Sequence, residues 1–401
     1  MHRKKVIYFL ILMIVAVVFG FAGTEEVDVY SFLYDNSRTN SAQLDLLQHM
    51  AEAKLTGAGE FYAKALRRLV SEYGSIRNVT ERNAADEQAI ILSALLGAEK
   101  YTQAAPDLWL VVNGFSAPLV KAEALIALGK IRATGYLPQV IRVLESVNAA
   151  PTPDRLNGER VAFGAIIALE KYQDPQGYLP VFFASTGWYS NRIRDQASKS
   201  LPFIATDPTP YMIEVVRGRN ITNPNSDNPY LVRFAALQTI EAAPSLSTQN
   251  KASVAVVALE QGWNAQTSVI QQRNTLAEMR KLAIQMINKY KTNDESIYPL
   301  LERSYTNGND TQEKFFAIAA LASQGTDESA RRLSKFLMDL NAKRQSGNIR
   351  PEDEQMVRAI IPALGQNGRP LGRPALNAVN SLDAWPPAVR SLAQNALRQI
   401  N

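Results

Sequence analysis

The sequence contains no cysteine and only two histidines, His2 and His49. Without cysteine the chain forms no disulfide, no thiolate-bound zinc or iron–sulfur centre, and no cysteine nucleophile. One histidine outside the N-terminal region excludes multi-histidine metal sites and leaves little for serine–histidine–aspartate catalysis. These absences favour a binding protein over an enzyme, and we expect no metal or other cofactor.

Long uncharged apolar runs are also lacking, with one exception at the N-terminus. Residues 2–5 are mostly basic, residues 6–22 carry no charge, and acidic residues follow from Glu25. This order is typical of a secretory signal peptide, here residues 1–23. A helix of seventeen residues is about 25 Å long, somewhat less than the roughly 30 Å hydrocarbon core, so an uncleaved membrane anchor is the alternative.

The leader predicts an exported protein, and a chain without cysteine suits a bacterial envelope, where folding then needs no oxidation. We expect a periplasmic location, or attachment to the inner membrane facing the periplasm if the leader is retained. Of the net charge of +5, three positive charges lie in the leader, which leaves +2 for the remainder. No basic run with interleaved aromatic residues follows, so we expect no nucleic-acid binding.

The chain repeats itself. Gly-Tyr-Leu-Pro occurs at residues 135–138 and again at 177–180. A second pattern has an apolar residue, often a basic residue next, then usually alanine at +4 and Leu or Ile at +8. Positions 0, +4 and +8 lie on one face of a helix, and a small residue lets a second helix approach closely. The pattern starts at Glu87, Val120, Val161, Ile193, Val232, Met279, Glu313, Met356 and Val389.

Shorter helices are expected between these copies, because proline suits the first turn of a helix. The prolines in question are Pro106, Pro138, Pro180, Pro210, Pro299 and Pro374. A single helix pair cannot bury its own apolar face, whereas stacked pairs share one core. The sequence therefore predicts an all-α fold, an α-solenoid superhelix of about eight to nine helix pairs.

The V-[KR]-x-x-A-x-x-A-L pattern of Val120–Leu128 resembles the HEAT-repeat family and the bilin-lyase-type HEAT-like repeats. The resemblance covers roughly residues 80–401. In such solenoids the second helix of each pair lines the concave face, so the resemblance implies a basic strip there that binds a partner. The alternative is that each basic side chain bonds a nearby carbonyl or carboxylate. The residues are Lys121, Arg194, Arg233, Arg280, Lys314 and Arg390.

The remaining segments are assigned from composition. Residues 24–40 are polar and mixed, so we expect a tether; residues 41–79 predict capping helices, and residues 80–401 the HEAT-like array. The glycine-rich segment 365–374 has two interpretations. In one, it cradles an anion at a helix start. In the other, it is a tight connection in which Gly365 ends one helix and Pro374 opens the next.

Trp188, Trp263 and Trp385 lie near expected turns, where they either anchor a partner or close the ends of the core. We expect an exported, non-enzymatic scaffold that binds a protein or peptide along the solenoid surface. One alternative is a membrane-anchored structural component of an envelope assembly. Another, implied only by the resemblance, is a cofactor-attachment lyase of the bilin-lyase-type group.

Overall fold

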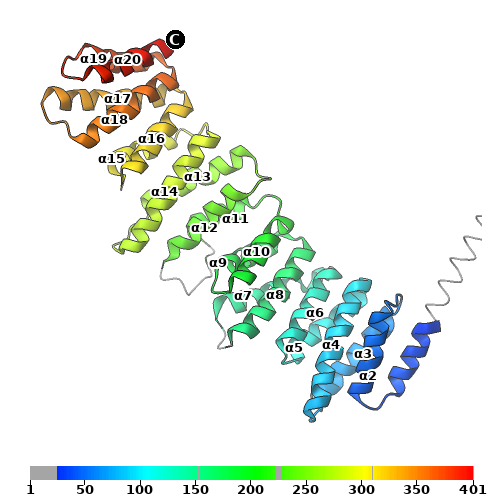
Figure 1. The fold of residues 1–401 in the computed structure, drawn as a ribbon. Helices are drawn as coiled ribbons and strands as arrows, with labels where there is room; N and C mark the ends of the chain where they lie inside the picture. Colours follow the sequence, from blue (N-terminus) through cyan, green and yellow to red (C-terminus); the bar gives the residue numbers. More distant parts are fainter. Residues whose placement is uncertain (1–24, 152–153, 220, 222–227, 309, 401) are drawn as a thin grey trace, which may run out of the picture. The chain divides into compact units, whose positions relative to one another are not determined.

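The structure is a computed structural model, and it describes residues 25–151, 154–219, 221, 228–308 and 310–400. In these residues the regular secondary structure is helical throughout, with no strand (Figure 1). The proposed leader, residues 1–23, lies outside the described part. No helix within the described part is both long enough and apolar enough to cross a membrane.

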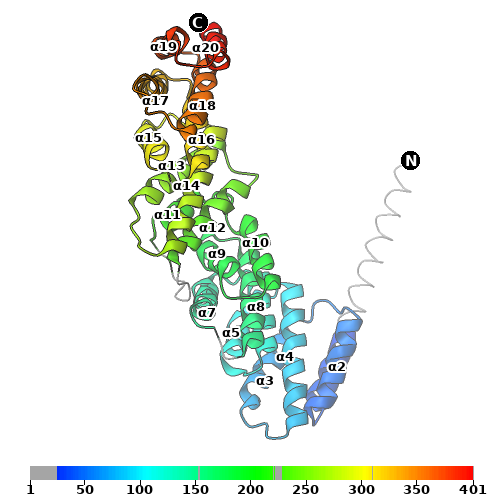
Figure 2. The same cartoon turned by 60° about the vertical axis from the view of Figure 1, so that its left-hand side comes forward.

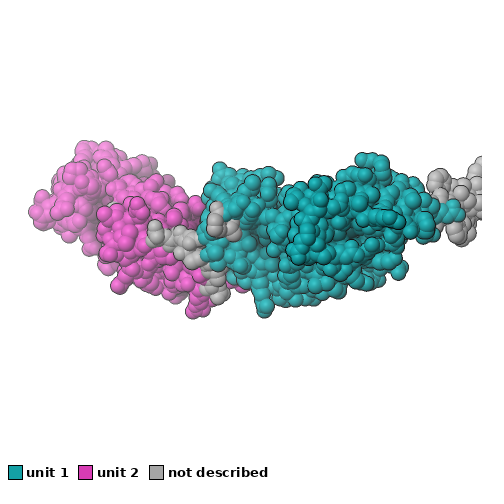
Figure 3. All heavy atoms as spheres, turned by 90° about the horizontal axis from the view of Figure 1, so that it is seen from below, with its two compact units in different colours: residues 1–205, 222–225 teal, residues 206–221, 226–401 magenta. Residues whose placement is uncertain are grey.

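The chain divides into two compact units (Figure 3). Among the described residues, those up to Ala205 belong to unit 1 and those from Thr206 onward to unit 2. Unit 1 begins with a helix over residues 25–36. Its other α-helices are α2 (Asn40–Glu52), α3 (Gly59–Tyr73), α4 (Val79–Glu99), α5 (Ala105–Gly114), α6 (Pro118–Lys130), α7 (Leu137–Ala149), α8 (Arg155–Tyr172), α9 (Tyr178–Thr186) and α10 (Asn191–Ile204).

Unit 2 continues the same alternation of shorter and longer helices. It contains α11 (Thr209–Val216), α12 (Pro229–Ala242), α13 (Thr248–Asn264), α14 (Ile270–Tyr290), α15 (Ile297–Asn307), α16 (Thr311–Gln324), α17 (Asp327–Gln345), α18 (Pro351–Asn367), α19 (Arg373–Ser381) and α20 (Pro387–Gln399). Short 3-10 turns precede four helices, at Thr102–Ala104, Thr134–Tyr136, Pro175–Gly177 and Pro370–Gly372.

Within each unit the helices pack in chain order (Figures 1 and 2). From α3 onward, each odd-numbered helix packs against the even-numbered helix that follows it. The even-numbered helices also pack side by side, α2 to α10 in unit 1 and α12 to α20 in unit 2. Such packing of neighbour against neighbour is consistent with an α-solenoid.

The recurring alanines explain how closely the even-numbered helices pack. All seven alanines at the +4 position are completely buried: Ala124, Ala165, Ala197, Ala236, Ala283, Ala317 and Ala393. The approach is closest between α6 and α8, where glycines face alanines. A Cβ atom at Gly129 would lie 2.5 Å from the Cα of Ala168, and one at Gly164 would lie 2.5 Å from the Cα of Ala122. The +4 alanines are thus buried within the packed helices, and the closest approach of α6 to α8 is at these two glycines.

The prolines also behave as predicted, because each lies within the first three residues of its helix. These helices are α5, α7, α9, α11, α15 and α19. One expectation about the glycine-rich segment is wrong, since α18 continues past Gly365 to Asn367 and ends at Gly368, whose φ is +75°. Gly365 instead faces α20, where a Cβ atom would lie 3.1 Å from the Cα of Ala396.

The segment expected as a tether, 24–40, is helical over residues 25–36. Its Tyr34 is only 2% exposed, and its hydroxyl donates a hydrogen bond to Gln88 Oε1 of α4 at 2.7 Å. The same ring meets Phe61 of α3 edge-on, with the ring centroids 5.4 Å apart. Packing of this aromatic side chain fixes the segment against unit 1, so it is part of the fold rather than a free linker.

Candidate functional site: a basic hollow on unit 1

The two predicted basic residues of unit 1 lie on α6 and α10, with α8 between them. Lys121 and Arg194 are both partly exposed. The equivalent position on α8 is Ala162, which is completely buried. Arg194 donates a hydrogen bond to Asn191 on its own helix. The series of basic residues is therefore interrupted at α8.

In unit 2 one of the predicted cations, Arg280, is enclosed by local contacts. Arg280 is 4% exposed and forms a bidentate ion pair with the fully buried Glu313, at 2.7 and 3.0 Å. It also donates to the carbonyl of Gly262 at 3.1 Å and lies 4.1 Å from the ring centroid of Trp263. A side chain so enclosed is not on a binding surface, which removes Arg280 from the predicted strip.

The other three predicted cations of unit 2 have separate environments. The Arg233 guanidinium packs on Gly218 and stands 5.1 Å from the ring centroid of Tyr230, and burial lowers its pKa. Arg390 forms an ion pair with Asp383 at 2.9 Å. Lys314 lines an open cleft between α15 and α18. Arg280 and Arg390 thus bond nearby carbonyl or carboxylate groups, as the alternative interpretation predicted.

The tryptophans link neighbouring helix pairs. The indole nitrogen of Trp188 donates to the carbonyl of Val147 at 3.1 Å, and that of Trp263 donates to Ser304 Oγ at 2.9 Å. Trp385 is 1% exposed and donates to Asn341 Oδ1 at 2.9 Å. These contacts support the packing interpretation rather than partner anchoring.

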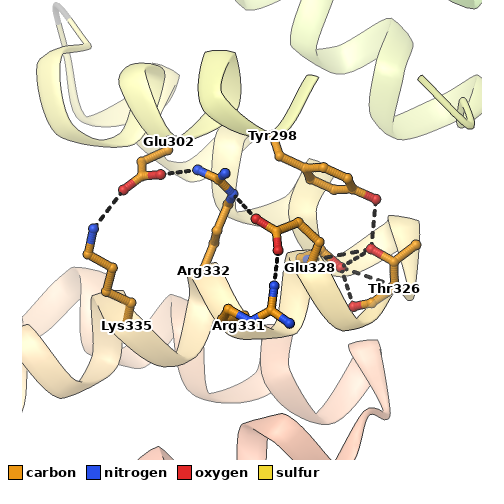
Figure 4. Close-up of polar contacts among 8 residues, drawn as sticks. Tyr298, Glu302, Thr326, Glu328, Arg331, Arg332 and Lys335 are labelled. Atoms are coloured by element: carbon orange, nitrogen blue, oxygen red, sulfur yellow. Dashed lines mark hydrogen bonds and ion pairs between the residues drawn. The ribbon is translucent and has the colours of Figure 1, made fainter. Parts of the chain in front are cut away.

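The charged surface of α15 and α17 is neutralised by its own pairs. Figure 4 shows Arg332 between Glu302 and Glu328, while Lys335 contacts Glu302 and Arg331 contacts Glu328. The Tyr298 hydroxyl lies 2.7 Å from Thr326 Oγ1, also between these two helices. Because each charge here meets an opposite one, the network stabilises the helix packing and leaves little charge for a partner.

In unit 1 positive charges outnumber negative ones at the place where α4, α6 and α8 end beside one another. Their C-terminal ends, together with the end of α10, line a hollow of about 920 Å³. That volume is within the range of sites that hold a ligand or a short peptide segment. Four cations and one carboxylate line it: Lys100, Lys130, Arg132, Lys171 and Glu170.

The backbone just beyond three of these helix ends is left-handed, a conformation that ordinarily favours glycine. Lys100, the residue after α4, has a φ of +55°, and Gln173, the residue after α8, has a φ of +57°. Arg132, two residues beyond α6, has a φ of +51°. Holding a non-glycine residue there costs about 1–2 kcal/mol. The side chains of Lys100, Arg132 and Gln173 all line the same hollow. A role in this hollow would explain why these positions carry side chains although glycine would be less strained.

The cations of the hollow are incompletely neutralised. Lys171 pairs with Glu170 at 2.8 Å, but Lys130 is 3.9 Å from Glu123. Arg132 donates to the neutral amide oxygen of Gln173 at 2.7 Å. Lys100 is exposed and has no hydrogen-bond or ion-pair partner among the residues that the structure describes. The four cations and one carboxylate leave three net positive charges in the lining. Each helix C-terminus carries about half a negative charge, so the four helix ends offset about two of them and the hollow stays positive.

Two further features shape the hollow. At Gly97 a Cβ atom would lie 3.0 Å from the Cδ atom of Lys130, so the missing side chain leaves room for the lysine stem to cross α4. Phe203, near the end of α10, lines the hollow with 59% of its surface exposed. The hollow thus combines an exposed aromatic ring with incompletely neutralised cations.

The basic residues predicted from the repeat follow the first apolar position of the pattern. The cations of the hollow stand elsewhere, at or just beyond the C-terminal ends of α4, α6 and α8. A signal was present, since Lys100 and Arg132 stand where a glycine cap is usual, and Gln173 follows at the equivalent place in the next repeat. What the sequence does not reveal is that these ends, with Phe203, converge on one surface.

No protein-family model matches this chain, and no curated protein sequence matches it.

Proposed function

We propose that this protein is a binding scaffold and that the hollow of unit 1 takes an acidic segment of a protein partner. The observation that carries the proposal is the convergence of Lys100, Lys130, Arg132 and Lys171 with a single carboxylate among them. Complementary charge of this kind raises association rates and selects partners of opposite sign. The protein acts by binding and performs no chemical turnover.

The proposal also includes the architecture and the location of the protein. The chain is a HEAT-like solenoid, a superhelix of eight or nine helix pairs, and residues 1–23 direct it to the cell envelope. The ordered pairing of odd-numbered and even-numbered helices supports the repeat architecture. The order of basic, apolar and acidic residues at the N-terminus supports export. A periplasmic partner with an acidic segment then has access to the hollow.

The test is a titration of the full chain with a fluorescein-labelled oligoglutamate peptide, followed by fluorescence anisotropy. We expect Lys100→Glu/Arg132→Glu to weaken binding by about tenfold or more at low salt, and salt to weaken wild-type binding further. The matched control is Arg77→Glu/Arg142→Glu, which changes the charge equally at two exposed positions that do not line the hollow.

Two results would overturn the proposal: oligoglutamate does not bind the wild-type chain, or the two double variants bind it equally. Inorganic polyphosphate serves as a competing probe. Tight binding of polyphosphate without binding of oligoglutamate would replace the acidic protein segment with a small polyanion.

A further inference from the structure

A second hollowed surface lies on the same helices as the basic hollow. The N-terminal halves of α6, α8 and α10 line a groove of about 360 Å³. Leu119 of α6 and Leu156 of α8 open onto it with 51% and 56% of their surfaces exposed. Ile126 and Phe163 extend the apolar lining toward the middle of the same two helices. Leucines this exposed, grouped in a groove, mark an interaction surface more often than isolated ones do.

The charges around the groove are mostly engaged within unit 1. Glu159 accepts hydrogen bonds from the backbone nitrogen and the hydroxyl of Ser190, at 2.6 and 2.8 Å, and it pairs with Arg155 at 3.0 Å. The Arg192 guanidinium lies 5.9 Å from the ring centroid of Phe163. The groove therefore offers mainly apolar surface, in contrast to the hollow.

The groove and the hollow occupy one face of α6. Leu119, Ile126 and Lys130 are separated by seven and four residues, which places all three on one side of a helix. Glu123 lines the groove and Lys130 lines the hollow, and their side chains are 3.9 Å apart. From Leu119 to Lys130 the helix rises about 16 Å. The two surfaces are therefore neighbouring parts of one surface that runs along the helices.

We propose that unit 1 recognises a partner segment with two parts, an aliphatic cluster that lies in the groove and an acidic run that lies in the hollow. This inference rests on the proposed function, because it names the partner of the same site. The separation of about 16 Å corresponds to about five residues of an extended segment or eleven of a helix. The aliphatic part supplies burial of apolar surface, and the acidic part supplies charge complementarity.

The test compares labelled peptides on the full chain. One peptide carries a leucine cluster and a glutamate run at the matching separation, a second has the same composition with leucines and glutamates mixed, and the third is oligoglutamate. We expect the two-part peptide to bind about tenfold more tightly than oligoglutamate, and the mixed peptide to lose most of that gain.

Variants separate this inference from the proposed function. Leu119→Ser/Leu156→Ser should reduce binding of the two-part peptide to the level of oligoglutamate and leave oligoglutamate binding unchanged. Leu110→Ser/Leu231→Ser alters two leucines of similar exposure that do not line the groove, and it should change neither. Circular dichroism of each variant checks that the helices are retained.

Equal binding of the two-part peptide and oligoglutamate would overturn this inference and leave the acidic-segment proposal standing. Equal binding of the two-part and mixed peptides would also overturn it. Absence of oligoglutamate binding would overturn the proposed function instead.

Discussion

At the scale of the residue, the hollow depends on basic side chains held at positions where the backbone would prefer glycine. Lys100 and Arg132 both have positive φ values, yet neither is glycine. These strained positions lie where the side chains at the ends of three successive even-numbered helices line one hollow. Strain of this kind is often retained where the side chain has a use.

Replacing Lys100 with glycine should therefore separate stability from binding. We expect Lys100→Gly to raise the free energy of unfolding by about 0.5–1 kcal/mol, because left-handed strain is relieved. The same change should weaken oligoglutamate binding severalfold, because one cation is lost. Urea denaturation and anisotropy measure the two effects.

The control for this change is Lys54→Gly, since Lys54 also has a positive φ of 52° but does not line the hollow. It should give a similar gain in stability with no change in binding. If Lys100→Gly bound oligoglutamate as tightly as the wild type, Lys100 would have no part in the site.

The buried pair of unit 2 is a second feature decided by single residues. Removing the charge in Glu313→Gln leaves Arg280 buried without its counter-ion, so we expect a loss of about 3–5 kcal/mol in unfolding free energy. The more exposed Glu328→Gln should cost less than about 1 kcal/mol. Arg280→Met/Glu313→Leu should recover most of the loss. Similar denaturation midpoints for Glu313→Gln and Glu328→Gln would contradict this role.

At the scale of the element, small residues set the distance between neighbouring even-numbered helices. The sequence was sufficient to predict this, because alanine recurs at one position of the repeat and proline at another. It was not sufficient for the helix over residues 25–36, because Tyr34 is fixed by Gln88 and Phe61 from distant segments. Nor did it predict Gly368 as the end of α18, because Gly365 is required for the approach of α20.

The close approach of α6 and α8 gives a prediction about Gly164. Alanine is favoured over glycine within a helix by about 1 kcal/mol, but its Cβ atom would lie 2.5 Å from the Cα of Ala122. Because backbone must move to admit it, we expect Gly164→Ala to lower the unfolding free energy by about 1–3 kcal/mol.

Since α6 and α8 carry Leu119 and Leu156, the same substitution should also weaken binding of the two-part peptide. Gly114→Ala is the control, because Gly114 ends α5 with no atom within 4 Å of the added carbon. It should be neutral or slightly stabilising. Equal stability of the two alanine variants would show that the helices separate without cost.

At the scale of the whole molecule, the repeat places equivalent residues of successive helices on one surface. This is why single positions that look unremarkable in the sequence become a hollow when Lys100, Arg132 and Gln173 are brought together. The class of fold can be predicted from the sequence, because it follows from repeated local patterns. The candidate site cannot be predicted in this way, because it depends on which of the many basic residues stay unpaired after folding.

The most direct measurement of the central claim places a photo-crosslinking benzoylphenylalanine at Phe203 of the full chain, in envelope extract. The control position is Phe32, which is also well exposed, at 69%, but does not line the hollow. We expect Phe203 to crosslink to a partner segment with an aliphatic cluster and an acidic run, and Lys100→Glu/Arg132→Glu to abolish the product. Absence of a product specific to Phe203, or one that survives the charge reversal, would contradict it.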